Sequence, residues 1–202
     1  MLIYFSRYRK KAAKYMRGQV RQKMVEGATK VLARRGLHAT AFSEVLAVTG
    51  ASRGSIYHHF PGGKAELIEA VLDDYGSDTD DALQALHGQP LMAVVRGALA
   101  LWRERLINDD CESSCPVAAV TVAADSTRLE SECRSIFDQW TATLAGALAS
   151  GGLKGAGQAR ALATLMMAAI QGGTVLARAQ GGIEPYDTMA RQITVYAEQM
   201  TD

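Results

Sequence analysis

The sequence has 202 residues, of which 48% are hydrophobic and 6% aromatic, and it carries a formal net charge of +1. This composition suits an all-helical globular protein, either one domain or two small domains that share a sizeable core. The three cysteines, Cys111, Cys115 and Cys133, are too few and too unevenly spaced for the disulfide framework of a small secreted protein. No cleavable signal is visible, so we expect a cytoplasmic protein.

The charges are segregated along the chain. Residues 1–35 contain eleven Lys or Arg and one acidic residue, whereas residues 65–202 contain nine basic and nineteen acidic residues. A basic end can approach a polyanion while an acidic body is repelled by it, so this distribution favours DNA as a partner. The first 18 residues form a basic arm with three open interpretations. The arm tracks a minor groove, is disordered, or precedes a true start at Met16 or Met24.

The first predicted helix carries an apolar stripe that ends at a glycine. Its stripe consists of Met24, Ala28, Val31 and Leu32. Gly36 follows as a C′ residue, the position just beyond a helix at which glycine is common.

Two short helices joined by a glycine turn come next. The stripe of the first consists of Phe42, Val45, Leu46 and Thr49, which recur at i, i+3, i+4 and i+7. Gly50 can adopt the positive φ that a tight turn needs. Ser52 is a candidate N-cap of the second helix, which buries Ile56 and Phe60 and leaves its other face outward. This arrangement predicts a helix-turn-helix whose second helix enters the major groove.

The run from Thr40 to Lys64, TAFSEVLAVTGASRGSIYHHFPGGK, resembles the DNA-binding signature of the TetR family of bacterial repressors. Its ending FPGGK and the downstream Cys115-Pro116-Val117 are similar to the LmrA/YxaF-like subgroup. The resemblance implies an all-α fold in two domains. These are a three-helix helix-turn-helix head at residues 1–65 and a C-terminal helical bundle at residues 66–202 for ligand binding and dimerisation.

The residues expected to contact DNA are Thr40, Ser52, Arg53, Gly54, Ser55, Tyr57, His58, His59 and Lys64. Arg53 can bond guanine O6 and N7, although a phosphate contact is the alternative. The family resemblance suggests phosphate and groove contacts for Ser55, Tyr57, His58 and Lys64, while Tyr57 could instead belong partly to the core. His58 and His59 do not indicate a metal site, because neighbouring side chains on a helix point about 100° apart. We expect His59 to be half-buried and no cofactor to be needed.

The remaining two thirds of the chain predict a helical bundle. The expected elements are a connector helix from Lys64 through the acidic segment that ends at Asp81, a buried helix opened by Pro90, a loop at 108–114, and helices at 117–125, from about 129 to 150, at 157–180 and from Pro185 onward. The uncharged run 161–177 is too short for a membrane span and contains Gln171, so we interpret it as a buried helix and expect no membrane association.

The last two helices are the predicted dimer interface. The helix at 157–180 is rich in small residues, among them Ala169 and Gly173, and is apolar around much of its circumference. Such a helix needs partners on two sides, which a two-fold dimer provides by forming a four-helix bundle with its mate. The alternative is an internal helix of a monomer. The family resemblance implies the dimer.

An effector pocket is predicted in the acidic domain, where the resemblance also places one. Its candidate lining residues are Trp102, Leu106, Cys115, Val117, Val120, Phe137, Trp140, Leu144, Met166, Met167 and Gln171. Together they would form an apolar cavity with one polar group, although each taken singly is more often plain core. Acidic neighbours of Cys111 and Cys115 disfavour a redox role, so Cys115 is expected to be structural or to line the pocket.

The predicted function is a ligand-responsive transcriptional repressor. A homodimer binds a pseudo-palindromic DNA operator and is released by a small apolar or aromatic effector. The alternative is a DNA-binding architectural protein without an effector, which would have weak sequence preference and no cavity. The sequence has no P-loop or HExxH motif, and its GxSxG match, Gly50 to Gly54, falls in the predicted helix-turn-helix rather than after a strand, so we do not expect an enzyme.

Overall fold

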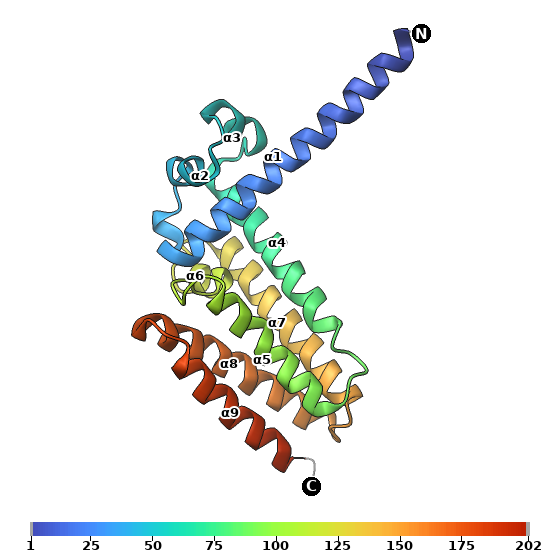
Figure 1. Ribbon diagram of the computed structural model, residues 1–202, viewed down its shortest axis with the longest axis vertical. Coiled ribbons are helices and arrows are strands. Elements are labelled where there is room, and N and C mark those ends of the chain that lie inside the picture. Colours follow the sequence, from blue (N-terminus) through green and yellow to red (C-terminus); the bar gives the residue numbers. More distant parts are fainter. Residues whose placement is uncertain (1, 201–202) are drawn as a thin grey trace.

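The structure, a computed structural model, describes residues 2–200, with side chains described from residue 18 onward except that of Ala156. All of the regular secondary structure in this part of the chain is helical (Figure 1), which confirms the predicted all-α fold. Their bounds are α1 Leu2–Ala39, α2 Phe42–Thr49, α3 Arg53–His59, α4 Gly63–Gln84, α5 Leu91–Ile107, α6 Pro116–Thr121, α7 Thr127–Ser150, α8 Ala156–Gln180 and α9 Glu184–Gln199. The backbone of the basic arm continues α1 from Leu2, while its side chains up to residue 17 lie outside the described residues.

The C-terminal half of α1 forms the head with α2 and α3, at one end of the molecule (Figure 1). The regular turns of α1 break at Gly36, whose φ of 78° suits glycine, as its predicted place beyond the helix requires. Gly50 ends α2 with a φ of 67° and so makes the predicted tight turn. Met24 of α1, Val45 of α2 and Ile56 of α3 are all fully buried, so one small core holds the three helices together.

α4 leaves the head and runs along the body beside α7 (Figure 1). Its buried stripe, Leu67, Ile68, Val71 and Leu72, follows helical spacing. α5, α7 and α8 complete the bundle, and α9 packs against α5 and α8 at its outer edge. α8 is long and apolar enough to cross a membrane by length and composition. In this structure it packs against α7 and α9.

α6 is shorter than predicted, because it ends at Thr121 rather than at Asp125. The backbone becomes extended at Ser126, where φ is −137° and ψ is 139°. The Ser126 hydroxyl then accepts a hydrogen bond from the Leu129 N–H at 3.4 Å and caps α7. Because Ser126 caps α7 in this way, the residues just before it do not continue α6.

α5 ends in a left-handed turn that leads into the α5–α6 loop, residues 108–115. The Cys111 N–H donates to the Leu106 carbonyl at 2.8 Å, a bond that spans five residues and is typical of a Schellman cap. Asp110 and Cys111 have φ values of 50° and 60°. This region of backbone conformation is uncommon for residues other than glycine.

Candidate DNA interface and regulatory domain

α3 presents a polar face to solvent from a firmly anchored base. The Ser52 hydroxyl accepts from the Ser55 N–H at 3.2 Å and caps the helix as predicted. Ile56 and the C-cap residue Phe60 are fully buried beneath it. Arg53, Gly54 and His58 are exposed, and Ser55 is half-buried. The helix is therefore held at its buried side while its N-terminal residues remain free to meet a ligand.

Tyr57 belongs to the exposed face despite one aromatic contact. Its ring meets the ring of Phe42 edge to face at 5.3 Å, yet 59% of the residue is exposed. His58 and His59 stack edge to face at 5.3 Å, and His59 is half-buried, as the sequence indicated. No group of three His, Cys, Asp or Glu among the described residues could hold a metal ion.

Thr40 requires a correction. Its side chain is fully buried, and its hydroxyl donates to the Gly36 carbonyl at 2.9 Å. In the free protein its hydroxyl therefore stabilises the turn after α1 and is not displayed to solvent as a DNA contact.

Lys64 also differs from the expectation of a phosphate contact. Its ammonium donates to the carbonyl of Leu37 at 2.6 Å and to that of His38 at 3.4 Å. These carbonyls lie just beyond the break in α1, where backbone acceptors need a donor. Lys64 thus ties the start of α4 to the head, and its charge compensates the end of α1.

The aromatic residues predicted for the pocket form a cluster that joins α4, α5 and α7. The Trp140 ring lies 5.4 Å from that of Phe137, 6.0 Å from that of Trp102 and 6.1 Å from that of Tyr75. The Trp140 indole N–H donates to the Gly76 carbonyl of α4 at 2.9 Å. The guanidinium of Arg105 lies over the Tyr75 ring at 4.6 Å and donates to the Tyr75 hydroxyl at 2.9 Å. This cluster connects the connector helix to the centre of the body.

Most of the predicted pocket residues are buried. Those buried to 5% exposure or less are Trp102, Leu106, Cys115, Val117, Val120, Trp140, Leu144, Met166 and Met167, while Phe137 and Gln171 are half-buried. Trp140 also lines a cleft of about 210 Å³ between α4 and α7. Among described residues, the Trp102 Nε1, Gln171 Nε2 and Thr174 Oγ1 atoms are buried without a hydrogen-bond partner. Such groups would gain a hydrogen bond from a ligand acceptor.

The cysteines are poorly suited to redox chemistry. Burial raises the pKa of Cys115 to about 11 and raises the pKa of Cys111 and Cys133. Thiolates are the reactive form, so burial disfavours reaction of these thiols near neutral pH.

α8 and α9 expose an apolar face, here named the α8–α9 face. Its large members are Leu165, Val175 and Leu176 of α8 and Tyr196 of α9, with Ala168 and Gly172 also exposed on α8. Gly173 does not belong to it, contrary to the expected small-residue interface. A Cβ on Gly173 would lie 2.9 Å from the Met189 Cε atom and 3.2 Å from the Tyr186 Cδ2 atom, so this glycine allows α9 to pack on α8 within one chain.

Comparison with known proteins follows this division into head and body. Residues 24–71 match the family of bacterial regulatory proteins called tetR, and residues 90–192 match the C-terminal domain of LmrA/YxaF-like transcriptional regulators. The HTH-type transcriptional regulator Rv0196 of Mycobacterium tuberculosis is 32% identical over 180 residues, covering 86% of this chain and 91% of that protein. YxaF of Bacillus subtilis is 30% identical over 183 residues, covering 89% and 95%.

A crystal structure of the regulatory protein TetR from Rhodobacter sphaeroides shares the fold. Its TM-score is 0.77 at 18% identity, over 86% of this chain and 96% of that one. These matches confirm the resemblance found at Thr40 to Lys64 and at Cys115-Pro116-Val117, and the relatives are regulators rather than enzymes. The chain therefore belongs to the TetR family of bacterial regulatory proteins and is a helix-turn-helix, DNA-binding transcriptional regulator with an LmrA/YxaF-like C-terminal domain.

Proposed function

We propose that the chain is a homodimeric repressor that binds a pseudo-palindromic operator through α3 and releases it when a small apolar or aromatic effector enters the C-terminal domain. The observation that carries the proposal is the exposed polar face of α3 above buried Ile56 and Phe60. A helix held in this way can lie in the major groove without rearrangement of the head.

Within α3, Arg53 has the best position for reading bases. It is the first helical residue, it is exposed, and Gly54 beside it leaves room for close approach to DNA. A guanidinium can bond guanine O6 and N7 at once. Tyr57 and His58 supply hydroxyl and imidazole groups for phosphate or groove contacts. The Ser52 hydroxyl accepts the capping hydrogen bond of α3. The chief contribution of Ser52 to DNA binding is therefore to fix where α3 begins.

We expect Arg53→Ala to weaken operator binding by about 1–3 kcal/mol, by an amount that depends on the base pair opposite the side chain. Lys64→Ala should instead weaken binding to every sequence alike, because it loosens the tie to the Leu37 carbonyl. Competition binding against operators changed one base pair at a time measures both. Equal losses on all sequences for both variants would assign Arg53 to phosphate contact.

The dimer is supported by the α8–α9 face. Large apolar side chains that stay exposed on neighbouring helices favour an interaction site. Two-fold pairing through it would present two copies of α3, as binding to half-sites about 34–36 Å apart or at a multiple of that spacing requires.

Effector release is supported by the aromatic cluster. The cluster includes Tyr75, and α4, which carries Tyr75, continues directly into the head. A planar aromatic compound inserted among Trp102, Phe137 and Trp140 would stack on their rings and displace α4. The unpaired Trp102 indole N–H would favour a compound with a hydrogen-bond acceptor.

Selection of DNA from random fragments by the full chain tests the proposal. We expect recovery of one pseudo-palindromic sequence, for which the affinity of the protein falls steeply as salt increases. A planar aromatic compound from a screened set should release the protein from this DNA. The close packing of the predicted pocket residues is what the architectural alternative expects. Recovery of fragments without a common sequence, and no release by any compound, would favour that alternative.

A further inference from the structure

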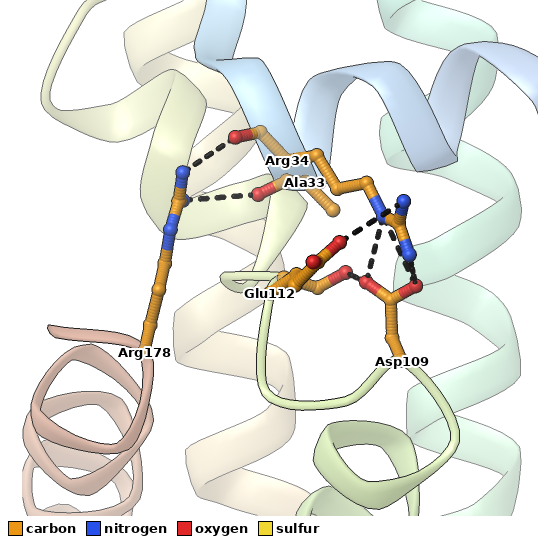
Figure 2. Close-up of polar contacts among 6 residues, drawn as sticks. Ala33, Arg34, Asp109, Glu112 and Arg178 are labelled. Atoms are coloured by element: carbon orange, nitrogen blue, oxygen red, sulfur yellow. Dashed lines mark hydrogen bonds and ion pairs between the residues drawn. The ribbon is translucent and has the colours of Figure 1, made fainter. Parts of the chain in front are cut away.

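Arg178, near the end of α8, contacts the last regular turn of α1 (Figure 2). One guanidinium nitrogen donates to the Ala33 carbonyl at 3.3 Å, and another donates to the Arg34 carbonyl. Arg178 and these residues are separated by 145 and 144 positions in the sequence. A side chain of the body thus binds backbone acceptors of the helix that supports the head.

The α5–α6 loop meets the same carbonyl. The Ser114 N–H and hydroxyl donate to the Ala33 carbonyl at 2.9 Å and 2.8 Å, and Arg178 also donates to the Ser114 hydroxyl at 3.3 Å. Three elements, α1, α8 and the loop, therefore converge on one backbone group. A charged donor suits this place, because the C-terminal end of a helix carries partial negative charge.

The Arg34 side chain extends away from Arg178 and binds the α5–α6 loop (Figure 2). It pairs with Asp109, and its guanidinium lies 3.2 Å from the Glu112 carboxylate. Ser113 also donates to Asp109. Exposed pairs of this kind stabilise little when taken singly, but together they restrict how the end of α1 can turn relative to the α5–α6 loop.

On the basis of the proposed homodimer, we propose that Arg178 is a positioning residue. It fixes the separation and orientation of the two recognition helices. It thereby sets the half-site spacing that the dimer accepts. α8 carries the α8–α9 face, and α1 carries α2 and α3. Arg178 joins the pairing helix to the reading head through a single side chain. α1 also packs against α4 and α6, and α4 runs along the opposite side of the body from α9 (Figure 1).

An arginine is the residue that this geometry requires. Its planar fork donates to two neighbouring carbonyls at fixed angles, whereas a lysine ammonium donates from one point. Arg178→Lys should therefore keep the charge and lose the angular restraint. Arg160 is a matched control on the same helix, since it is exposed and its ion pair with Asp138 spans 4.0 Å.

The test uses the full chain and the operator that it selects, with one base pair inserted or deleted between the half-sites. One base pair turns a half-site by about 34° and moves it by about 3.4 Å. We expect the wild type and Arg160→Ala to lose about ten-fold affinity per step, and Arg178→Ala to lose less than about three-fold, with Arg178→Lys between them. Affinity for an isolated half-site should be equal in all four proteins.

A second measurement needs no DNA. A spin label on Ser43→Cys, an exposed position of α2, reports the distance between the two heads. The distance distribution should broaden with Arg178→Ala and stay unchanged with Arg160→Ala. If Arg178→Ala discriminates between spacings as well as the wild type does, and its distance distribution is unchanged, the role proposed for Arg178 is wrong while the proposed function stands. A wild type that is monomeric or selects no operator would overturn the proposed function and this inference with it.

Discussion

Leu165→Glu combined with Leu176→Glu is expected to yield a folded monomer that no longer holds the operator. Both leucines lie on the α8–α9 face and are 42% and 52% exposed, so carboxylates there remain in water in the single chain. In a dimer the same carboxylates would be buried opposite their own copies. Removing unpaired charges from water costs several kcal/mol per ion, which is enough to separate the protomers.

The loss of DNA affinity should exceed the loss of any single contact. A monomer binds through one short helix, whereas the dimer gains about 10²–10⁴ in affinity from effective concentration once one head is bound. Sedimentation velocity should show half the mass, circular dichroism an unchanged helix content, and competition binding at least a hundred-fold weaker operator complex.

Ser131→Glu combined with Ala142→Glu is the matched control. These residues lie on α7, are exposed, and have the same spacing along their helix as the two leucines. The control should remain a dimer and lose little affinity. A dimer that survives the two α8 changes would show that the subunits pair elsewhere.

Trp140→Ala is expected to lower the free energy of unfolding by about 3–5 kcal/mol, the usual range for truncation of a buried aromatic residue. Trp140 is fully buried, touches three aromatic rings and supplies the hydrogen bond to the Gly76 carbonyl. The sequence left open whether Trp140 lines a pocket or belongs to the core. Its burial gives it a part in the core, whatever it contributes to a ligand.

Trp140→Phe separates the two contributions. It keeps an aromatic ring in place and removes the donor to the Gly76 carbonyl, which keeps its helical partner, so we expect a smaller loss of about 0.5–1.5 kcal/mol from the missing hydrogen bond. Urea unfolding followed by circular dichroism measures both variants. A loss below about 1 kcal/mol for Trp140→Ala would indicate that the cluster is loosely packed and already open to a ligand.

The features that sequence predicted best are those governed by local rules. Gly36, Gly50 and Ser52 end or start helices through backbone φ or a hydroxyl cap, and both effects act within a few residues. Helical spacing likewise identified Ile56 and Phe60 as the buried side of α3. The exposed side followed from these two by exclusion.

The features that the sequence did not predict depend on contacts between distant segments of the chain. Nothing in the pattern around Lys64 indicates that its ammonium binds the carbonyl of Leu37, 27 residues earlier. Periodicity also left undecided which apolar side of α8 faces α9, because small residues occur all around that helix. Gly173 is thus an intrachain contact, and Gly172 beside it is exposed.

The left-handed cap of α5 limits which sequences can occupy the turn. Asp110 has a φ of 50°, a conformation that glycine and asparagine also adopt readily and that costs a β-branched residue about 1–3 kcal/mol. Glycine there would relieve backbone strain but enlarge the freedom of the unfolded chain, and the two effects nearly cancel. Substitutions that accumulate at position 110 over evolution should therefore be confined to Asp, Asn and Gly. The turn is constrained by backbone shape, although its side chain lies at the surface.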